Sequence, residues 1–249
     1  MSALAGRVAL VTGSSRGIGA AIAKRFGDAG ARVALHGRDA DALARTQAEI
    51  PGARAFTADV THADELERMR AAIESELGPV EVLVVNAGGS FEPPCGIEDA
   101  TEAGWHAAVS GNLTSAFLTL KTFLPGMQQR GRGAVITISS ASARRPHVKN
   151  PLGYAAAKAG LEQLTQDLAL RAGPHGVRVN CIAPETILTA RNRERIPENV
   201  RASLADAHPL ARLGTPEDVA DAALFLASDQ SAWITGAIID LSGGAVIRR

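Results

Sequence analysis

The stretch Arg7-Val-Ala-Leu-Val-Thr12, followed directly by Gly13-Ser-Ser-Arg-Gly17-Ile-Gly19, decides the fold of this chain. Its first half is a short aliphatic run that predicts a strand, and the alanine-rich residues 20–29 predict a helix directly after the glycines. Strand, glycine turn and helix in this order indicate a nucleotide-binding opening, because glycines permit close backbone approach and the helix N-terminus offers unpaired N–H groups to a phosphate. The spacing GxxxGxG is wider than GxGxxG, and glycines also serve ordinary tight turns, so other features must support this interpretation.

Strands and helices alternate along the rest of the chain. The pattern predicts strands at 32–35, 54–57, 82–85, 134–138 and 237–241, and helices at 39–50, 62–77, 101–127, 152–172 and from the capping segment 213–218 to about 228. A second capping signal, Thr61-His-Ala-Asp64, opens the helix at 62–77. The alternation predicts an α/β fold with a doubly wound parallel sheet and helices on both faces, in one domain over residues 1–249. The charged residues 186–213 are expected to form a loop-like lid over a substrate.

Composition narrows the classes of partner. Lys plus Arg equals Asp plus Glu, at 26 each, so no net field attracts nucleic acid or an anionic membrane. The start of the chain lacks a signal-peptide pattern and no apolar run is long enough to span a membrane, so a cytoplasmic protein is expected. Cys95 and Cys181 lie far apart without metal-binding spacing, and the six histidines form no close pair. No metal site is expected.

The end of the second predicted strand bears on the choice of nucleotide. His36-Gly37-Arg38 stands about twenty residues beyond the glycine turn, where a carboxylate would normally bind the ribose 2′-hydroxyl of NAD. Gly37 fills that position, and Arg38 and Arg16 could together bind a 2′-phosphate. NADP(H) is therefore favoured over NAD(H). Two solvated surface arginines are the alternative.

Tyr154, the only tyrosine, is followed four positions later by Lys158 within Tyr154-Ala-Ala-Ala-Lys158. This spacing puts the two side chains on one face of a helix, where the ammonium could lower the pKa of the phenol. An isolated tyrosine and lysine at this spacing would more often be structural. Asn112, in the middle of a predicted helix, predicts a kink or a buried polar role. Ser140 ends the predicted strand at 134–138, where its hydroxyl can bind a substrate carbonyl, and Ser142 is a weaker candidate.

Taken together, these motifs resemble the short-chain dehydrogenase/reductase family over essentially the whole chain. The resemblance rests on TGSSRGIG at 12–19, NAG at 86–88, Asn112, ISS at 138–140 and YAAAK at 154–158. It implies that Tyr154 is the general acid/base, Ser140 holds the substrate oxygen, Lys158 binds the nicotinamide ribose and lowers the tyrosine pKa, and Asn112 supports a proton-relay water. The expected cofactor-binding residues are Gly13, Ser15, Arg16, Gly17, Ile18, Gly19, Arg38, Asp59, Val60, Asn86, Ala87, Gly88, Tyr154, Lys158, Ile187 and Thr189. Asp59 is expected to meet the adenine amino group.

The chain departs from the family pattern at two positions. Val85 stands where an asparagine is usual, and Glu185 follows Pro184 where a glycine is usual, beside the expected nicotinamide position. The carboxylate of Glu185 is expected to point outward; if it faced the ring, it would favour the oxidised cofactor by charge attraction.

The resulting hypothesis is an NADP(H)-dependent oxidoreductase that interconverts a carbonyl and a secondary alcohol. A catalytically silent NADP-binding scaffold or redox sensor, and a non-redox dehydratase or epimerase, are the alternatives. Substrate identity stays open: many relatives reduce 3-oxoacyl thioesters, and the basic residues at 144–149 and 191–195 would suit an anionic substrate, although solvated charge explains them as well. The family resemblance also implies a homotetramer, built through the helices at 101–127 and 152–172 and through the C-terminal segment.

Overall fold

The computed structural model describes residues 2–246 and contains a seven-stranded, entirely parallel sheet in that range. The strand order is β3-β2-β1-β4-β5-β6-β7. The strands are β1 (Val8–Val11), β2 (Arg32–Gly37), β3 (Arg54–Thr57), β4 (Val82–Val85), β5 (Gly133–Ile138), β6 (Val177–Pro184) and β7 (Ile238–Leu241). This is the doubly wound order, in which the chain starts at the centre and fills one side of the sheet before the other. The predicted fold class is confirmed.

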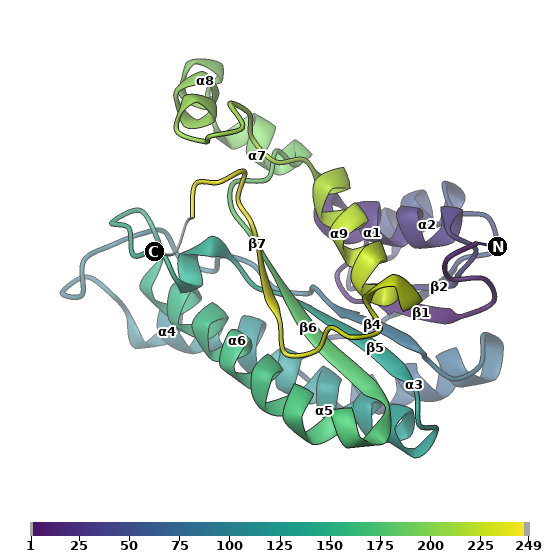
Figure 1. Cartoon of the computed structure of the whole chain (residues 1–249). Helices are drawn as coiled ribbons and strands as arrows, with labels where there is room; N and C mark the ends of the chain where they lie inside the picture. The colour runs from purple at the N-terminus through teal and green to yellow at the C-terminus, as the bar shows by residue number, and fades with distance from the viewer. Residues whose placement is uncertain (1, 247–249) are drawn as a thin grey trace.

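Helices cover both faces of the sheet (Figure 1). One face carries α1 (Gly17–Asp28), α2 (Ala40–Ala48) and α9 (Pro216–Ala227); the other carries α3 (Ala63–Glu76), α4 (Glu102–Val109), α5 (Ser115–Gln129) and α6 (Leu152–Ala172). Short 3₁₀ turns occupy Ala141–Ala143, Gly173–His175 and Asp229–Ser231. The residues of the central strands face one core or the other in alternation: Val8 and Leu10 pack with α3 and α5, whereas Ala9 and Val11 pack with α1 and α9. Burial on both faces explains why the strands read as continuous apolar runs.

The helix predicted over 101–127 is interrupted. A π-helical turn at Ser110–Thr114 separates α4 from α5, and Asn112 lies at its centre with no exposed surface. π-helical turns inside α-helices are rare and frequently mark functional sites. The asparagine therefore has both features that its position predicted, an irregular helix and a buried polar side chain.

The lid region differs from its prediction. Residues 186–213 are not loop-like throughout but contain α7 (Ala190–Arg195) and α8 (Glu198–Asp206), which project beyond the carboxyl ends of the strands (Figure 1). Neither helix buries a residue. Both helices are short and mostly polar, and they do not pack against the core.

The two predicted capping signals have different outcomes. Thr215 and Asp218 form a complete capping box at the start of α9, as predicted. The signal at Thr61 is wrong: α3 is preceded by His62, which makes no side-chain cap, and the Thr61 hydroxyl donates instead to Asp59 at 2.7 Å.

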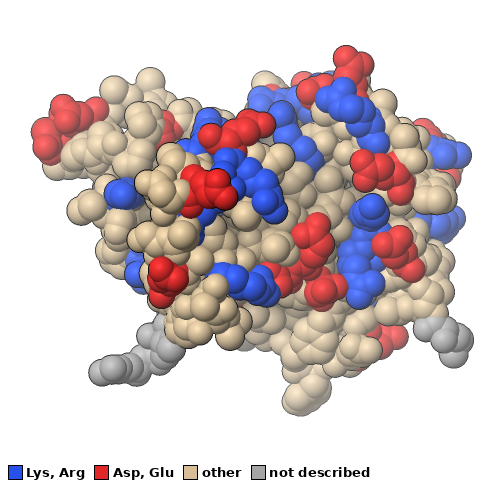
Figure 2. Space-filling model, turned by 90° about the horizontal axis from the view of Figure 1, so that it is seen from above, with Lys and Arg blue, Asp and Glu red and all other residues tan. Residues whose placement is uncertain are grey.

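Basic and acidic side chains are interspersed on the face that carries α1 and α9 (Figure 2). Several form ion pairs between elements, such as Arg25 with Asp221 at 2.6 Å and Arg7 with Asp229 at 2.6 Å. This face therefore presents no broad field of one sign. Within residues 2–246, no helix is both long and apolar enough to cross a membrane.

Candidate active site

The predicted site residues gather at the carboxyl edge of the sheet. In a parallel sheet all strands end at the same edge, so the segments after β1, β4, β5 and β6 meet there. Helix α6 begins beside this edge and brings Tyr154 and Lys158 to the end of β5. Residues far apart in the sequence are thus collected by topology alone.

Tyr154 and Lys158 form a close pair. The Lys158 Nζ atom lies 5.7 Å from the centroid of the Tyr154 ring, one helical turn away. The lysine is only 4% exposed, and its Nζ donates a hydrogen bond to the Ile138 carbonyl oxygen at 2.8 Å. This bond ties the ammonium to the end of β5 and fixes its distance from the phenol.

Burial is the largest influence on the pKa values of both members of the pair. Burial raises the pKa of Tyr154, and a hydrogen bond with Ser140 offsets only part of that effect. Burial also lowers the pKa of Lys158 to about 8. Desolvation penalises the charged forms of both side chains and is the largest cause of both shifts.

Two adjacent serines at the end of β5 point in different directions. Ser140 hydrogen-bonds with Tyr154, and its Oγ also accepts from the Ser142 amide at 3.2 Å. Ser139 is buried and its Oγ contacts the Lys158 carbonyl oxygen at 3.1 Å and Glu162 at 3.0 Å. The Ser142 hydroxyl donates to Asn150 and not to the tyrosine. Of the three, Ser140 is the serine that the fold brings to Tyr154.

A buried ionic network lies behind these serines, and no motif in the sequence predicts it. The Arg144 guanidinium, 9% exposed, bridges Glu162 of α6 at 3.1 Å and Asp240 of β7 at 2.6 Å. Burial raises the pKa of Glu162, and the hydrogen bonds from Ser139 and Arg144 oppose that rise. Arg144 is therefore committed to an internal role, which corrects its suggested availability to an anionic substrate. Its neighbour Arg145 is exposed.

Asn112 connects the π-helical turn to the segment after β4. Its Nδ2 donates to the carbonyl oxygens of Gly89 and Ala108, both at 2.9 Å, and its Oδ1 accepts from the Gly89 amide at 3.0 Å. Both amide hydrogens are thus used within the protein. If Asn112 supports a water molecule, it must do so through its backbone or through the second lone pair of Oδ1.

The glycine turn is held closely against Asn86. The Asn86 Nδ2 donates to the carbonyl oxygens of Thr12 at 2.9 Å and Gly13 at 3.1 Å. A Cβ atom on Gly19 would lie 2.3 Å from the Gly13 carbonyl oxygen, so this position requires glycine. Asn86 therefore shapes the turn, and the segment that it begins, with Ala87 and Gly88, lines the same edge.

His36 is a buried member of the cofactor region that the sequence analysis did not select. Its Nδ1 accepts from the Gly13 amide at 3.2 Å, and its Nε2 lies 3.0 Å from the Ala58 carbonyl oxygen. These partners require the neutral ring with hydrogen on Nε2, and burial lowers the pKa of His36 accordingly. The ring braces the glycine turn against the end of β3, next to Asp59 and Val60.

The remaining predicted cofactor residues occupy both ends of this edge. Arg38 is 76% exposed and its guanidinium lies 3.8 Å from Asp59, while Arg16 is exposed at the start of α1. Ser15 lies against Gly37, and Ile18 follows in α1. At the other end, Thr189 contacts Gly17, and Ile187 is buried and bridges to Gly214.

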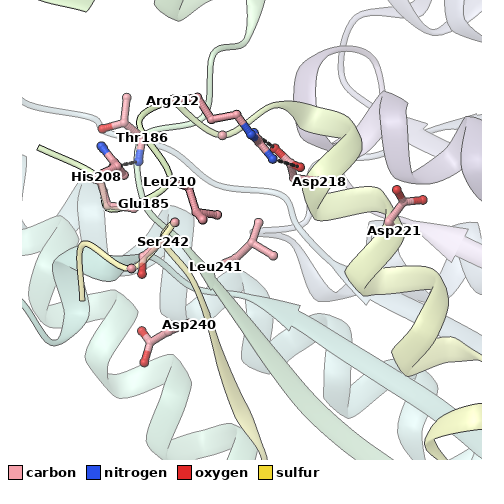
Figure 3. Close-up of a pocket in the computed structure, with 13 residues that line it drawn as sticks. Glu185, Thr186, His208, Leu210, Arg212, Asp218, Asp221, Asp240, Leu241 and Ser242 are labelled. Atoms are coloured by element: carbon pink, nitrogen blue, oxygen red, sulfur yellow. Dashed lines mark hydrogen bonds and ion pairs between the residues drawn. The ribbon is translucent and has the colours of Figure 1, made fainter. Parts of the chain in front are cut away.

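Glu185 points away from the glycine turn and toward the lid. Its carboxylate contacts His208 at 2.7 Å and the Thr186 amide. A cavity of about 380 Å³ lies beside it, between the base of the lid and β7, and is also lined by Leu210, Arg212 and Asp240 (Figure 3). Neither Tyr154 nor Ser140 lines this cavity.

Cysteine and metal chemistry find little support in the described residues. Cys95 and Cys181 are free thiols, and burial raises the pKa of Cys181 to about 11, so its thiolate is scarce near neutral pH. Within residues 2–246, no group of three or more His, Cys, Asp or Glu side chains could hold a metal ion.

Comparison with known proteins agrees with the fold described above. Residues 13–246 match a family model described as enoyl-(acyl carrier protein) reductase. A Sinorhizobium fredii protein described as an uncharacterized short-chain type dehydrogenase/reductase is 36% identical over 98% of this chain and 99% of its own length. The 7alpha-hydroxysteroid dehydrogenase of Escherichia coli K12 is 36% identical over 98% of this chain and 95% of its own. The solved structure of a levodione reductase is 31% identical with a TM-score of 0.90, over 97% of this chain and 98% of that one.

Proposed function

This chain belongs to the short-chain dehydrogenase/reductase family, and on that premise we propose that it is a single-domain, NADP(H)-dependent enzyme that interconverts a carbonyl and a secondary alcohol through Tyr154. Family membership already implies an oxidoreductase that acts on small alcohols or carbonyl compounds with a nicotinamide cofactor. The proposal adds the identity of the cofactor and the roles of individual residues. The single observation that carries it is the convergence of Tyr154, Lys158 and Ser140 at the end of β5.

Each of these residues has a chemical task in the proposed reaction. When bound, the nicotinamide supplies or accepts the hydride. In the reductive direction Tyr154 donates its phenolic proton to the carbonyl oxygen, and in the oxidative direction it takes the proton from the hydroxyl group. Ser140 orients that oxygen, and Lys158 holds a positive charge near the phenol, where it favours the phenolate. Because burial raises the tyrosine pKa, the positive charge of an oxidised nicotinamide is needed to help ionise it.

Asn112 supports this arrangement through the backbone. Two of its hydrogen bonds hold Gly89, and with it the segment Ala87-Gly88-Gly89, at the cofactor edge, and the third goes to the Ala108 carbonyl oxygen. Gly88 cannot carry a side chain there, because a Cβ atom would lie 2.5 Å from the Asn112 Oδ1 atom. Asn112 is thus proposed to shape the cofactor edge as well as to support a relay water.

NADP(H) is proposed over NAD(H) because of the charge at the end of β2. Gly37 leaves the position without a carboxylate, and the exposed Arg38 and Arg16 guanidinium groups are available to a 2′-phosphate. Asp59 lies near Arg38 at 3.8 Å, but exposed pairs at such a distance contribute little free energy. A phosphate with a bidentate arginine would compete with it readily.

A homotetramer is proposed from two exposed apolar surfaces. On α5 and α6, Phe117 and Leu170 are exposed beside a 420 Å³ hollow whose floor includes Gly160 and Leu164. Next to β7, Trp233 is fully exposed. Surfaces of this kind on two sides of a subunit suit an assembly with two types of contact. Light scattering coupled to size-exclusion chromatography would test this, with Phe117→Arg expected to reduce the molecular mass.

The activity is tested by absorbance at the nicotinamide band. The wild-type protein with NADPH should be screened against ketones, including cyclic ketones and 3-oxoacyl thioesters, and with NADP⁺ against the corresponding alcohols. Tyr154→Phe should reduce kcat to less than about one hundredth, because proton transfer is lost. Cofactor binding, followed by fluorescence titration, should stay within about twofold. Full turnover in Tyr154→Phe would refute the proposed mechanism, and wild-type cofactor binding without turnover of any compound would favour the silent scaffold.

A further inference from the structure

Glu185 and His208 form a hydrogen-bonded ion pair at the base of the lid, as Figure 3 shows. The backbone of Glu185 is held at the end of the sheet, because the residue follows β6 and its amide donates to the Leu241 carbonyl oxygen at 3.0 Å. His208 belongs to the turn that follows α8 and is 5% exposed. The pair therefore joins the end of the sheet to the far end of the lid. Family resemblance does not account for it, because a glycine is expected at position 185.

The hydrogen-bond partners of His208 fix its charge. Its Nε2 lies 2.7 Å from the Glu185 carboxylate and its Nδ1 lies 2.6 Å from the Leu204 carbonyl oxygen. A carbonyl oxygen only accepts, and an ionised carboxylate only accepts, so both ring nitrogens must carry hydrogen. Burial acts to raise the pKa of Glu185, but hydrogen bonds from the Thr186 amide and His208 outweigh it and leave that pKa below its ordinary value. The geometry thus fits a histidine cation paired with a carboxylate anion.

Other charged groups around the same cavity are already paired elsewhere. Arg212 binds Asp218 at 2.6 Å, Asp221 of α9 binds Arg25 of α1, and Asp240 of β7 binds Arg144. The segment after β7 contributes only Ser242, Gly243 and Gly244 to the cavity. Glu185 is the carboxylate within hydrogen-bonding distance of His208 in the described part of the chain. The charge of His208 therefore acts chiefly on Glu185.

The lid has few other attachments. Helices α7 and α8 bury no residue, and the other attachments lie at the base of the lid: backbone hydrogen bonds between Leu188 and Gly214 at 2.7 Å and between Leu210 and Gly243 at 3.2 Å, the ion pair of Arg212 with Asp218, and the buried side chains of Ile187 and Leu213. Ala211, two residues before the lid ends, has a φ of 52°, a strained value for a residue with a Cβ atom. A segment with so little buried surface depends on its few polar anchors.

We propose that Glu185 and His208 are a positioning pair that holds the lid over the substrate cleft while His208 is protonated and releases it as the histidine loses its proton. The inference rests on the proposed function, in which residues 186–213 cover the substrate. Deprotonation leaves one ring hydrogen for two acceptors, so a lone pair would face either Glu185 or Leu204 at less than 3 Å. The lid should consequently be held less firmly once His208 has lost its proton.

The first test measures how readily the lid is cleaved by a protease and requires no enzyme activity. Trypsin can cleave at the exposed Arg191, Arg193 and Arg195, and mass spectrometry identifies the fragments. Cleavage of wild-type protein, normalised to a small peptide substrate, should accelerate several-fold between pH 5.5 and 8.5. Glu185→Gln and His208→Gln should be cleaved rapidly at both pH values. Asp221→Asn, which removes a carboxylate from the same cavity without touching the lid, should behave as wild type.

The second test uses kinetics with the full enzyme at pH 6. Glu185→Gln should raise the substrate KM about tenfold, leave kcat within about threefold and leave the NADPH dissociation constant within about twofold. Wild-type cleavage of Glu185→Gln, or a pH response that persists in His208→Gln, would overturn the proposal. If His208→Gln does not fold, the result for Glu185→Gln alone tests the proposal, since glutamine has nearly the same size as glutamate. Failure of the proposed function would instead appear in Tyr154→Phe, whose lid cleavage should be unchanged.

Discussion

The ammonium group of Lys158 lies 5.7 Å from the centroid of the Tyr154 ring and is almost completely removed from solvent. Burial lowers the pKa of the lysine to about 8 and raises that of the tyrosine. The protein therefore holds the Lys158 ammonium group in a position where burial disfavours the charged form. This cost is the basis of the first prediction.

Lys158→Met should stabilise the cofactor-free protein while abolishing its activity. A shift from 10.5 to about 8 corresponds to roughly 3 kcal/mol at about 1.4 kcal/mol per unit. Loss of the hydrogen bond to Ile138 offsets about 1 to 2 kcal/mol of this, so the free energy of unfolding should rise by about 1 to 2 kcal/mol. Urea denaturation at pH 7 measures it, with the exposed Lys24→Met as control. A destabilised Lys158→Met would contradict this account.

The buried His36 should make stability fall in mild acid. Because its folded pKa lies below 6.5, the unfolded chain binds a proton that the folded protein does not, once the pH drops below about 6.5. The contribution is complete above that pH and declines by at most about 1.4 kcal/mol per pH unit. His36→Gln should remove this component from the difference in unfolding free energy between pH 7.5 and 5.5. His62→Gln, on the surface, should not; an equal slope in both variants would exclude His36 as the source.

Arg38→Asp should move cofactor preference from NADP(H) toward NAD(H). The change removes a phosphate ligand and supplies a carboxylate near the ribose hydroxyl position. The ratio of kcat/KM for NADPH to that for NADH should drop at least about tenfold. Arg54→Asp, which makes the same change in charge at the amino end of the neighbouring strand β3, is the matched control. An unchanged ratio for Arg38→Asp would refute the assigned preference.

Arg144→Met should destabilise the fold far more than Arg145→Met. Removing one member of a buried ion network leaves the others uncompensated, which costs about 3 kcal/mol, whereas an exposed arginine contributes within about 0.5 kcal/mol. Thermal and urea unfolding distinguish the two variants. The restored stability of an Arg144→Met, Glu162→Leu, Asp240→Leu triple variant would confirm that uncompensated charge, and not lost volume, causes the effect. Equal stabilities of the two single variants would contradict it.

Local sequence patterns predicted six of the seven strands, all but β6, together with the helices on both faces of the sheet and the family. The strand at β1, the glycine turn and the Tyr154–Lys158 spacing are contiguous signals, and each depends on residues at most a few positions apart. Even the unusual Asn112 was visible, because asparagine is unfavourable in the middle of a helix. These features can therefore be predicted from the sequence alone.

The residues that escaped prediction depend on contacts between distant segments. His36 is defined by Gly13 and Ala58, and Glu162 by Ser139 and Arg144, none of which is adjacent in the sequence. The same holds for Glu185, whose outward direction was expected but whose partner, His208, lies 23 residues away. The helices of the lid were missed for a different reason, since they are short and mostly polar. Desolvation, which raises the pKa of Tyr154, is likewise a property of the packed structure alone.

In the entirely parallel sheet, the turns at the amino edge are separated from the proposed site at the carboxyl edge by the length of the strands. The turns at its amino edge, near residues 51–53, 78–81, 130–132 and 173–176, lie about four residues of strand, or roughly 13 Å, from the nearest proposed site residue. Affinity tags, fluorophores or immobilisation handles inserted at these turns should therefore leave turnover intact. For practical engineering, attachments can be placed at the amino edge of the sheet while the proposed site at the carboxyl edge keeps its geometry.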